Sequence, residues 1–106
     1  MGERTANVHP GDLGQTITKL ADIIAARRQA DPEASYTKRL LDGPEDKPLK
    51  KLVEESCEVV MACKDADHDH IRYECADVVY HLLVVCERWH ITPAELAGEL
   101  NARMKP

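Results

Sequence analysis

The sequence contains no phenylalanine, and aromatic residues make up only 4% of its 106 residues. A core of Leu, Val, Ile and Ala is therefore expected, which favours helices over a β-sandwich, because sandwiches tend to use aromatics and many turns. No segment alternates convincingly between apolar and polar residues, as a half-buried strand does. The length suggests one domain with a modestly stabilising core, so oligomerisation would help. These absences predict an all-α fold.

The sequence also lacks any run of Lys or Arg, and its formal net charge is -5. Nucleic-acid binding usually needs a basic stripe, so we expect neither nucleic acid nor a membrane as a partner. No signal-peptide segment and no span of about 20 apolar residues is present, which predicts a cytoplasmic protein. If the substrate is an anion, something other than net charge must attract it.

A C-x-x-C pair is missing as well, although the chain has four cysteines, Cys57, Cys63, Cys75 and Cys86. A zinc finger or a redox motif is therefore not expected. Each cysteine falls within a predicted helix among apolar residues, where a reduced thiol behaves as a small hydrophobe.

Hydrophobic spacing and turn residues predict an antiparallel bundle of about four to five helices. Residues 1–12 have no period and are expected to form a flexible N-terminal extension before a single helical domain at residues 13–106. The helices are expected at about Leu13–Ala30, at a short segment after Asp31 and Pro32, and at about Leu49–Asp65, His70–Arg88 and Pro93–Met104. Asp31 is the expected N-cap of the short helix, and Thr92 with Glu95 forms a capping box before the last.

Two carboxylates, Glu74 and Asp77, interrupt the most apolar helix of the chain. At about 100° per residue they share one narrow stripe with His81, while the rest of the circumference is almost entirely apolar. A helix that is apolar nearly all round is buried, so the stripe is expected to face an enclosed polar site.

The preceding helix repeats this design with Glu55 and Glu58, which Glu54 flanks. Residues three apart lie side by side on a helix, so two such pairs on adjacent antiparallel helices can bring four carboxylates together. Their repulsion in a partly buried site requires protons or cations. An all-oxygen ligand set suits Mg²⁺ or Mn²⁺, which keep positions open for water and phosphate. Such pairs are also common on solvated helix faces, and that is the alternative interpretation.

A longer pattern surrounds these acids. It consists of Ser35-Tyr36-Thr37 with Leu40, two lysines before the glutamates, Glu54-Glu55-x-x-Glu58, Glu74-x-x-Asp77, and "YHLL" after the aspartate. Over about residues 15 to 104 the chain resembles the phosphoribosyl-ATP pyrophosphohydrolase family, part of the all-α MazG-like nucleotide pyrophosphohydrolases. The resemblance implies Mg²⁺-dependent hydrolysis of phosphoribosyl-ATP to phosphoribosyl-AMP and pyrophosphate in histidine biosynthesis. It also implies a bundle completed by homodimerisation, or by higher homo-oligomers, with sites near the subunit interface.

The acidic pairs and the family resemblance together suggest roles for individual residues. The expected metal ligands are Glu55, Glu58, Glu74 and Asp77, and the expected catalytic residues are Glu54, which would activate water or support the metal ligands, and Glu55. The expected substrate-binding residues are Ser35, Tyr36, Thr37, Lys50, Lys51, Lys64 and His81. For the lysines the alternative is a solvated surface position, and for His81 and Tyr36 it is packing within the fold. Two other functions stay open: a house-cleaning nucleoside triphosphate pyrophosphohydrolase, and a non-catalytic helical dimer.

Overall fold

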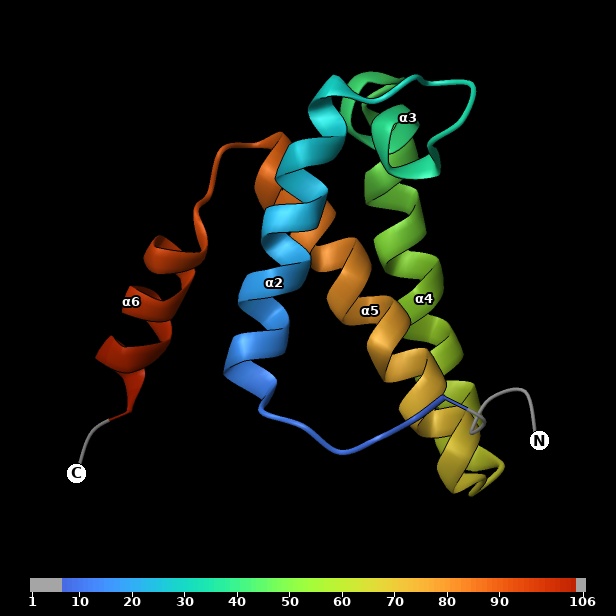
Figure 1. The fold of residues 1–106 in the computed structure, drawn as a ribbon. Helices are drawn as coiled ribbons and strands as arrows, with labels where there is room; N and C mark the ends of the chain where they lie inside the picture. The colour runs from blue at the N-terminus through green and yellow to red at the C-terminus, as the bar shows by residue number, and fades with distance from the viewer. Residues whose placement is uncertain (1–6, 105–106) are drawn as a thin grey trace.

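The computed structural model describes residues 7–104, and helices form its whole architecture in this range (Figure 1). The elements are α2 (Leu13–Ala26), the 3-10 helix η1 (Arg27–Gln29), α3 (Tyr36–Asp42), α4 (Asp46–Lys64), α5 (His68–Arg88) and α6 (Pro93–Arg103). No strand occurs among the residues described. The prediction of an all-α bundle is therefore confirmed.

Helices α4 and α5 form a long antiparallel hairpin that dominates the packing of the molecule (Figure 1). The turn between them uses the left-handed conformation of Ala66, with φ 55°, and the Asp67 carboxylate accepts the backbone N–H of His70 at 3.2 Å to cap α5. Helix α2 crosses α5 and runs in the same general direction, while α3 sits at the upper end of the hairpin. Helix α6 lies apart from α4 and buries none of its residues.

The core lies where α2, α3 and α5 meet. Its buried side chains are Ile24, Leu40, Leu41, Leu83 and Val84, and Ile17, Leu20, Val79 and Tyr80 pack against them. All but one of these are aliphatic, as the shortage of aromatic residues predicts. The core fixes the position of α3 over one end of the α4–α5 hairpin, and therefore the position of Tyr36 beside the acidic residues.

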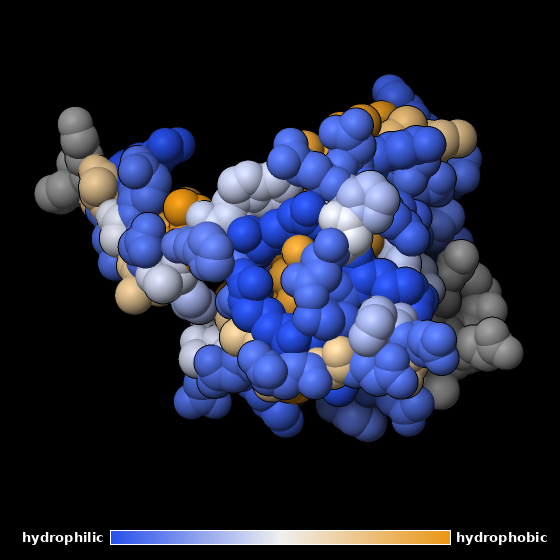
Figure 2. Space-filling model, turned by 90° about the horizontal axis from the view of Figure 1, so that it is seen from above, coloured by the Kyte–Doolittle hydropathy of each residue, from blue (hydrophilic) through white to orange (hydrophobic). Residues whose placement is uncertain are grey.

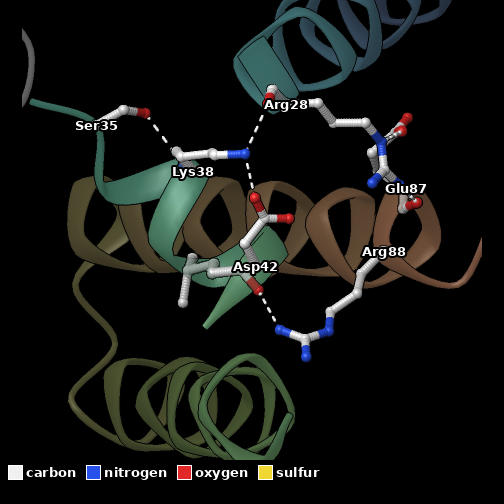
Figure 3. Close-up of polar contacts among 7 residues, drawn as sticks. Arg28, Ser35, Lys38, Asp42, Glu87 and Arg88 are labelled. Carbon is white, nitrogen blue, oxygen red and sulfur yellow. Dashed lines mark hydrogen bonds and ion pairs between the residues drawn. The ribbon is translucent and has the colours of Figure 1, made fainter. Parts of the chain in front are cut away.

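Polar contacts of the same elements surround this core (Figure 3). The Arg28 guanidinium binds both the carboxylate and the backbone oxygen of Glu87, and Lys38 binds the backbone oxygen of Arg28 and the Asp42 carboxylate. Arg88 donates to the backbone oxygen of Leu40 at 2.8 Å. These contacts attach η1 and α3 to the end of α5.

Two details of the predicted helices are wrong. The first helix ends at Ala26 and continues only as η1, rather than reaching Ala30. Asp31 does not cap the short helix; its carboxylate accepts the N–H of Glu33 at 3.0 Å in a tight turn. Ser35 is the cap instead, accepting the N–H of Lys38 at 3.1 Å, because the turn after Pro32 delays the helix by several residues. Other boundaries lie close to those predicted, and Thr92 caps α6.

The expectation that the helix carrying Glu74 and Asp77, now α5, is buried all round also fails for the single chain. Of α5, only Glu74, His81, Leu83 and Val84 are buried. The physical reason is that α2 and α3 cover one side of the α4–α5 hairpin, while within residues 7–104 the other side is bare, with Val60 and Met61 of α4 exposed. Cys57, Cys63 and Cys75 are exposed, and burial raises the pKa of the half-buried Cys86 thiol.

The predicted N-terminal extension falls partly on residues 1–6, which lie outside the described residues; residues 7–12 contain no helix. Within the described part of the chain, every helix is too short or too polar to cross a membrane.

Candidate metal centre

Three carboxylates from two helices meet at one point of the hairpin. Glu55 of α4 and Glu74 and Asp77 of α5 each offer an oxygen, and these oxygens all lie within 4.8 Å of one another. Glu74 and Asp77 are neighbours because residues three apart share a helix face. Glu55 joins them because α4 runs antiparallel beside α5. The local sequence pattern and the hairpin together build the cluster.

Without a bound cation, burial makes the ionised state of these three carboxylates unfavourable. Glu74 is only 6% exposed, and burial, followed by the charges of Asp77 and Glu55, raises the pKa of its carboxyl. Burial and then Glu55 likewise raise the pKa of Asp77. At an effective dielectric constant near 20, two full charges at this separation repel by roughly 3 to 4 kcal/mol. A bound cation or a proton must offset this repulsion.

Glu58 and Glu54 stand outside the group of three. Both are exposed on α4, but the charge of Glu58 still reaches Glu74 and contributes to its raised pKa. Glu54 faces Lys51, whose ammonium lies 3.7 Å from its carboxylate. The structure thus brings together three of the four expected metal ligands, with Glu58 one helical turn beyond Glu55.

Lys51 and Tyr36 border the cluster. The Lys51 ammonium lies 3.4 Å from the Glu55 carboxylate. Burial alone would lower the pKa of Lys51, but Tyr36, Glu55 and Glu54 outweigh it and raise the pKa. Burial raises the pKa of the Tyr36 hydroxyl, with Lys51 acting in the opposite direction. The site therefore pairs an acidic centre with an adjacent ammonium group and a partly exposed aromatic ring.

His81 lies one turn beyond Asp77 and is 6% exposed. Its Nδ1 lies 2.9 Å from the backbone oxygen of Asp77, which makes Nδ1 the donor of this hydrogen bond. Its Nε2 is buried and has no hydrogen-bond partner in the structure. The ring stands edge-on to Tyr80 and Tyr36, at 4.9 and 6.4 Å between centroids. His81 thus connects a candidate ligand to the aromatic side of the site.

The remaining expected substrate-binding residues are placed differently. Thr37 is half-buried and its hydroxyl lies 2.5 Å from the Tyr80 hydroxyl, while the Ser35 hydroxyl caps α3. Lys50 and Lys64 are exposed on α4, and Lys64 lies in its last turn. None of these four belongs to the carboxylate cluster.

Sequence reasoning gave no individual role to three side chains near Tyr36, although Tyr80 is part of the "YHLL" pattern. Tyr80 bonds to Thr37, and Arg39 and Lys47 each approach the Tyr36 ring to 5.7 Å from its centroid. The available signal was helical spacing: Arg39 follows Tyr36 by three residues, and Lys47 precedes Lys51 by four.

The residues present fit a hard divalent cation. Every donor in the cluster is a carboxylate oxygen, which is the ligand type that Mg²⁺ and Mn²⁺ prefer. Burial, followed by the neighbouring carboxylates, raises the pKa of Glu74 and of Asp77 more than the nearby Lys51 and histidines lower them, so a bound cation would stabilise the ionised groups.

The family model for phosphoribosyl-ATP pyrophosphohydrolase matches residues 17–104. A phosphoribosyl-ATP pyrophosphatase of Nitrosomonas eutropha is 45% identical over 87 residues, which cover 82% of this chain and 74% of that protein. A protein of the same name from Rhizobium johnstonii is 43% identical over 90 residues, covering 85% of this chain and 84% of the relative.

A third relative is larger. The histidine biosynthesis bifunctional protein HisIE of Nostoc is 49% identical over 92 residues, which are 87% of this chain but 43% of that protein. The similarity thus extends to a domain of a bifunctional protein. The matched region of the family model contains the three clustered carboxylates and the whole α3–α5 unit. The chain belongs to the phosphoribosyl-ATP pyrophosphohydrolase family.

Proposed function

We propose that this chain hydrolyses phosphoribosyl-ATP to phosphoribosyl-AMP and pyrophosphate in histidine biosynthesis, with Mg²⁺, or Mn²⁺ in its place, as cofactor. Family membership supports the reaction. The single observation that supports the cofactor is the convergence of Glu55, Glu74 and Asp77 within 4.8 Å.

In this proposal Glu55, Glu74 and Asp77 hold the cation, and Glu58 is the fourth ligand from the same side of the hairpin. A bound divalent cation would neutralise phosphate charge and polarise the phosphoryl oxygens. Glu54 lies nearby on the exposed side of α4, where it accepts a proton from the attacking water or orients the ligands. Water adds to phosphorus, and the bond to the pyrophosphate leaving group breaks.

The residues around the cluster serve the nucleotide. Lys51, held 3.4 Å from Glu55, faces the phosphate chain, and Tyr36, which is 38% exposed, contacts the base beside Arg39 and Lys47. The buried Nε2 of His81 has no hydrogen-bond partner among residues 7–104, which suits a polar group of the substrate. Ser35 and Thr37 keep α3 in place, and Lys50 and Lys64 add positive charge along α4.

Homodimerisation completes the proposal. Val53, Val60 and Met61 of α4 are 71%, 57% and 58% exposed, which is unusual for three apolar side chains of one helix. An open apolar hollow of about 320 Å³ between α4 and α5, lined in part by Val59 and Val78, lies on the same hairpin. Exposed apolar patches of this kind mark interaction surfaces.

A cytoplasmic location of the protein also stays a prediction.

The test is a pyrophosphate-release assay with phosphoribosyl-ATP and, in parallel, ATP, each with Mg²⁺ and with EDTA. We expect release from phosphoribosyl-ATP only when Mg²⁺ is present. Hydrolysis of ATP alone would support the house-cleaning alternative and contradict the substrate assignment. Equal rates with and without the metal would contradict the cofactor assignment.

A further inference from the structure

Two basic side chains flank the ring of Tyr36. The Arg39 guanidinium carbon and the Lys47 ammonium nitrogen each lie 5.7 Å from the ring centroid. Lys47 lies on α4 eight residues before Glu55, which places it about 12 Å from Glu55 along the helix axis at 1.5 Å per residue. The pair is therefore close to the proposed nucleotide site but well separated from the carboxylates.

Neither of these cations is neutralised by a carboxylate of the described residues. Within residues 7–104, no carboxylate lies within ion-pair distance of Arg39 or Lys47. Arg39 donates one hydrogen bond to the backbone oxygen of Pro32 at 2.7 Å and has other N–H groups to offer. The nearby carboxylate of Asp42 is already engaged by Lys38 (Figure 3). Two unpaired positive charges beside one ring are complementary to an anion.

A hollow of about 300 Å³ lies between the end of α3 and the start of α4, and both cations line it together with Lys38, Asp42 and Gly43. A Cβ at Gly43 would lie 2.5 Å from the backbone oxygen of Arg39, so a side chain there would force the turn to move. Figure 2 looks down on the end of the molecule where α3 lies and shows mainly hydrophilic residues on this surface. The walls of the hollow are largely apolar, but its three lining cations, Lys38, Arg39 and Lys47, outnumber its one carboxylate, Asp42, so the hollow is suited to an anion.

We propose that Arg39 and Lys47 form a subsite for the phosphate of the phosphoribosyl group of the substrate. This inference rests on the proposed function, because phosphoribosyl-ATP carries two anionic ends: the triphosphate, and a phosphomonoester that ATP lacks. With the triphosphate at Glu55, Glu74 and Asp77, the base extends past Tyr36 and the phosphomonoester reaches the two cations. Arg39 and Lys47 then distinguish phosphoribosyl-ATP from ATP.

The first test uses ribose 5-phosphate as the probe, with free ribose beside it, in a titration followed by protein NMR. Lys47→Gln is the variant of choice, because the Lys47 ammonium has no hydrogen bond in the structure that its loss would break. We expect ribose 5-phosphate, but not ribose, to shift the signals of α3 and the start of α4. The variant should raise the Kd about tenfold, equivalent to about 1.4 kcal/mol. Lys19→Gln on α2 is the matched control and should leave the Kd unchanged.

The second test distinguishes the two phosphate groups of the substrate that this subsite could bind, the phosphomonoester and the triphosphate. In Lys47→Gln, the Kd for phosphoribosyl-ATP should rise about tenfold, while the Kd for ATP stays the same. An equal loss for both nucleotides would place the triphosphate at this subsite and overturn the proposal. So would a wild-type protein that does not bind ribose 5-phosphate. A protein that binds ribose 5-phosphate at Lys47 but releases no pyrophosphate would overturn the proposed function and leave the subsite standing.

Discussion

The carboxylates of Glu55 and Asp77 approach within 4.8 Å although they belong to different helices and stand far apart in the sequence. Burial and the charge of Glu55 raise the pKa of Asp77. Protein folding thus creates a local repulsion that a cation would relieve. The packing of α4 against α5 keeps the two carboxylates close together despite their repulsion.

Neutralising either partner of this pair should remove activity and spare the fold. Glu55→Gln and Asp77→Asn should each lower the rate of pyrophosphate release at least about 100-fold, because loss of even an outer partner of a metal ligand costs roughly 10 to 100-fold. Asp22→Asn, an exposed site on α2, is the matched control and should keep full activity. Circular dichroism checks that the variants remain helical. Full activity in Asp77→Asn would contradict its role.

The stability of the metal-free protein should depend on the protonation of Glu74. Its folded-state pKa lies above the ordinary value of 4.5, because of burial and then the charge of Asp77. The folded state therefore retains this proton more strongly than the unfolded state, and the resulting stability is fully present below pH 4.5 and lost as pH rises through the folded pKa. Near neutral pH the ionised carboxylate is a cost.

Glu74→Gln removes that cost. In EDTA near pH 7 the variant should unfold at a higher Tm than the wild type, where each 1 kcal/mol corresponds to about 4–8 °C for a domain of about this size. The difference should shrink as the pH falls toward 4.5, where wild-type Glu74 becomes protonated. Thermal unfolding across this pH series is the measurement, with the exposed Glu33→Gln as control. A difference that does not change with pH would refute the explanation.

Two adjacent isoleucines of α2 should differ sharply in their contribution to stability. Ile24 is 1% exposed and Ile23 is 42% exposed. Ile24→Ala should lower the free energy of unfolding by about 2–5 kcal/mol, because it leaves a cavity in the core. Ile23→Ala should cost clearly less. Urea unfolding monitored by circular dichroism gives both values, and equal losses would show that α2 packs differently.

The contact between Arg28 and Glu87 should stabilise the attachment of η1 to α5. The Arg28 Nε lies 2.5 Å from the Glu87 carboxylate, and both side chains are about a quarter exposed, at 29% and 25%. Because solvent screens such a pair in part, Glu87→Gln should cost about 1 kcal/mol. A double-mutant cycle with Arg28→Met measures the coupling free energy. A coupling of zero would mean that the pair contributes nothing.

The bare side of the α4–α5 hairpin should carry the subunit interface. Val60 is 57% exposed, and a charge placed there by Val60→Lys would have to be buried if a second copy covers it. We expect wild-type dimers and a shift of the variant toward monomers in light scattering after size exclusion. Ile91→Lys, at an exposed position before α6, is the control. A variant that remains a dimer would exclude this face.

Sequence periodicity predicted the helices and the acidic pairs because both depend on local spacing. Glu74 and Asp77 share a face on any helix, whatever packs against it. The Thr37–Tyr80 contact depends on how α3 crosses α5, which no local pattern encodes. Likewise, the apolar circumference of α5 predicted burial but contained no information on which side the chain itself would cover. The position of Ser35 as a cap depended on the exact length of the turn after Pro32.

The most direct test of the metal centre is a titration with Mn²⁺ followed by electron paramagnetic resonance. The wild type should bind Mn²⁺, and Mg²⁺ should displace it, whereas the triple variant Glu55→Gln, Glu74→Gln, Asp77→Asn should bind none at the same concentration while keeping its helical circular dichroism. Equal binding of Mn²⁺ by the wild type and the folded triple variant would contradict the account.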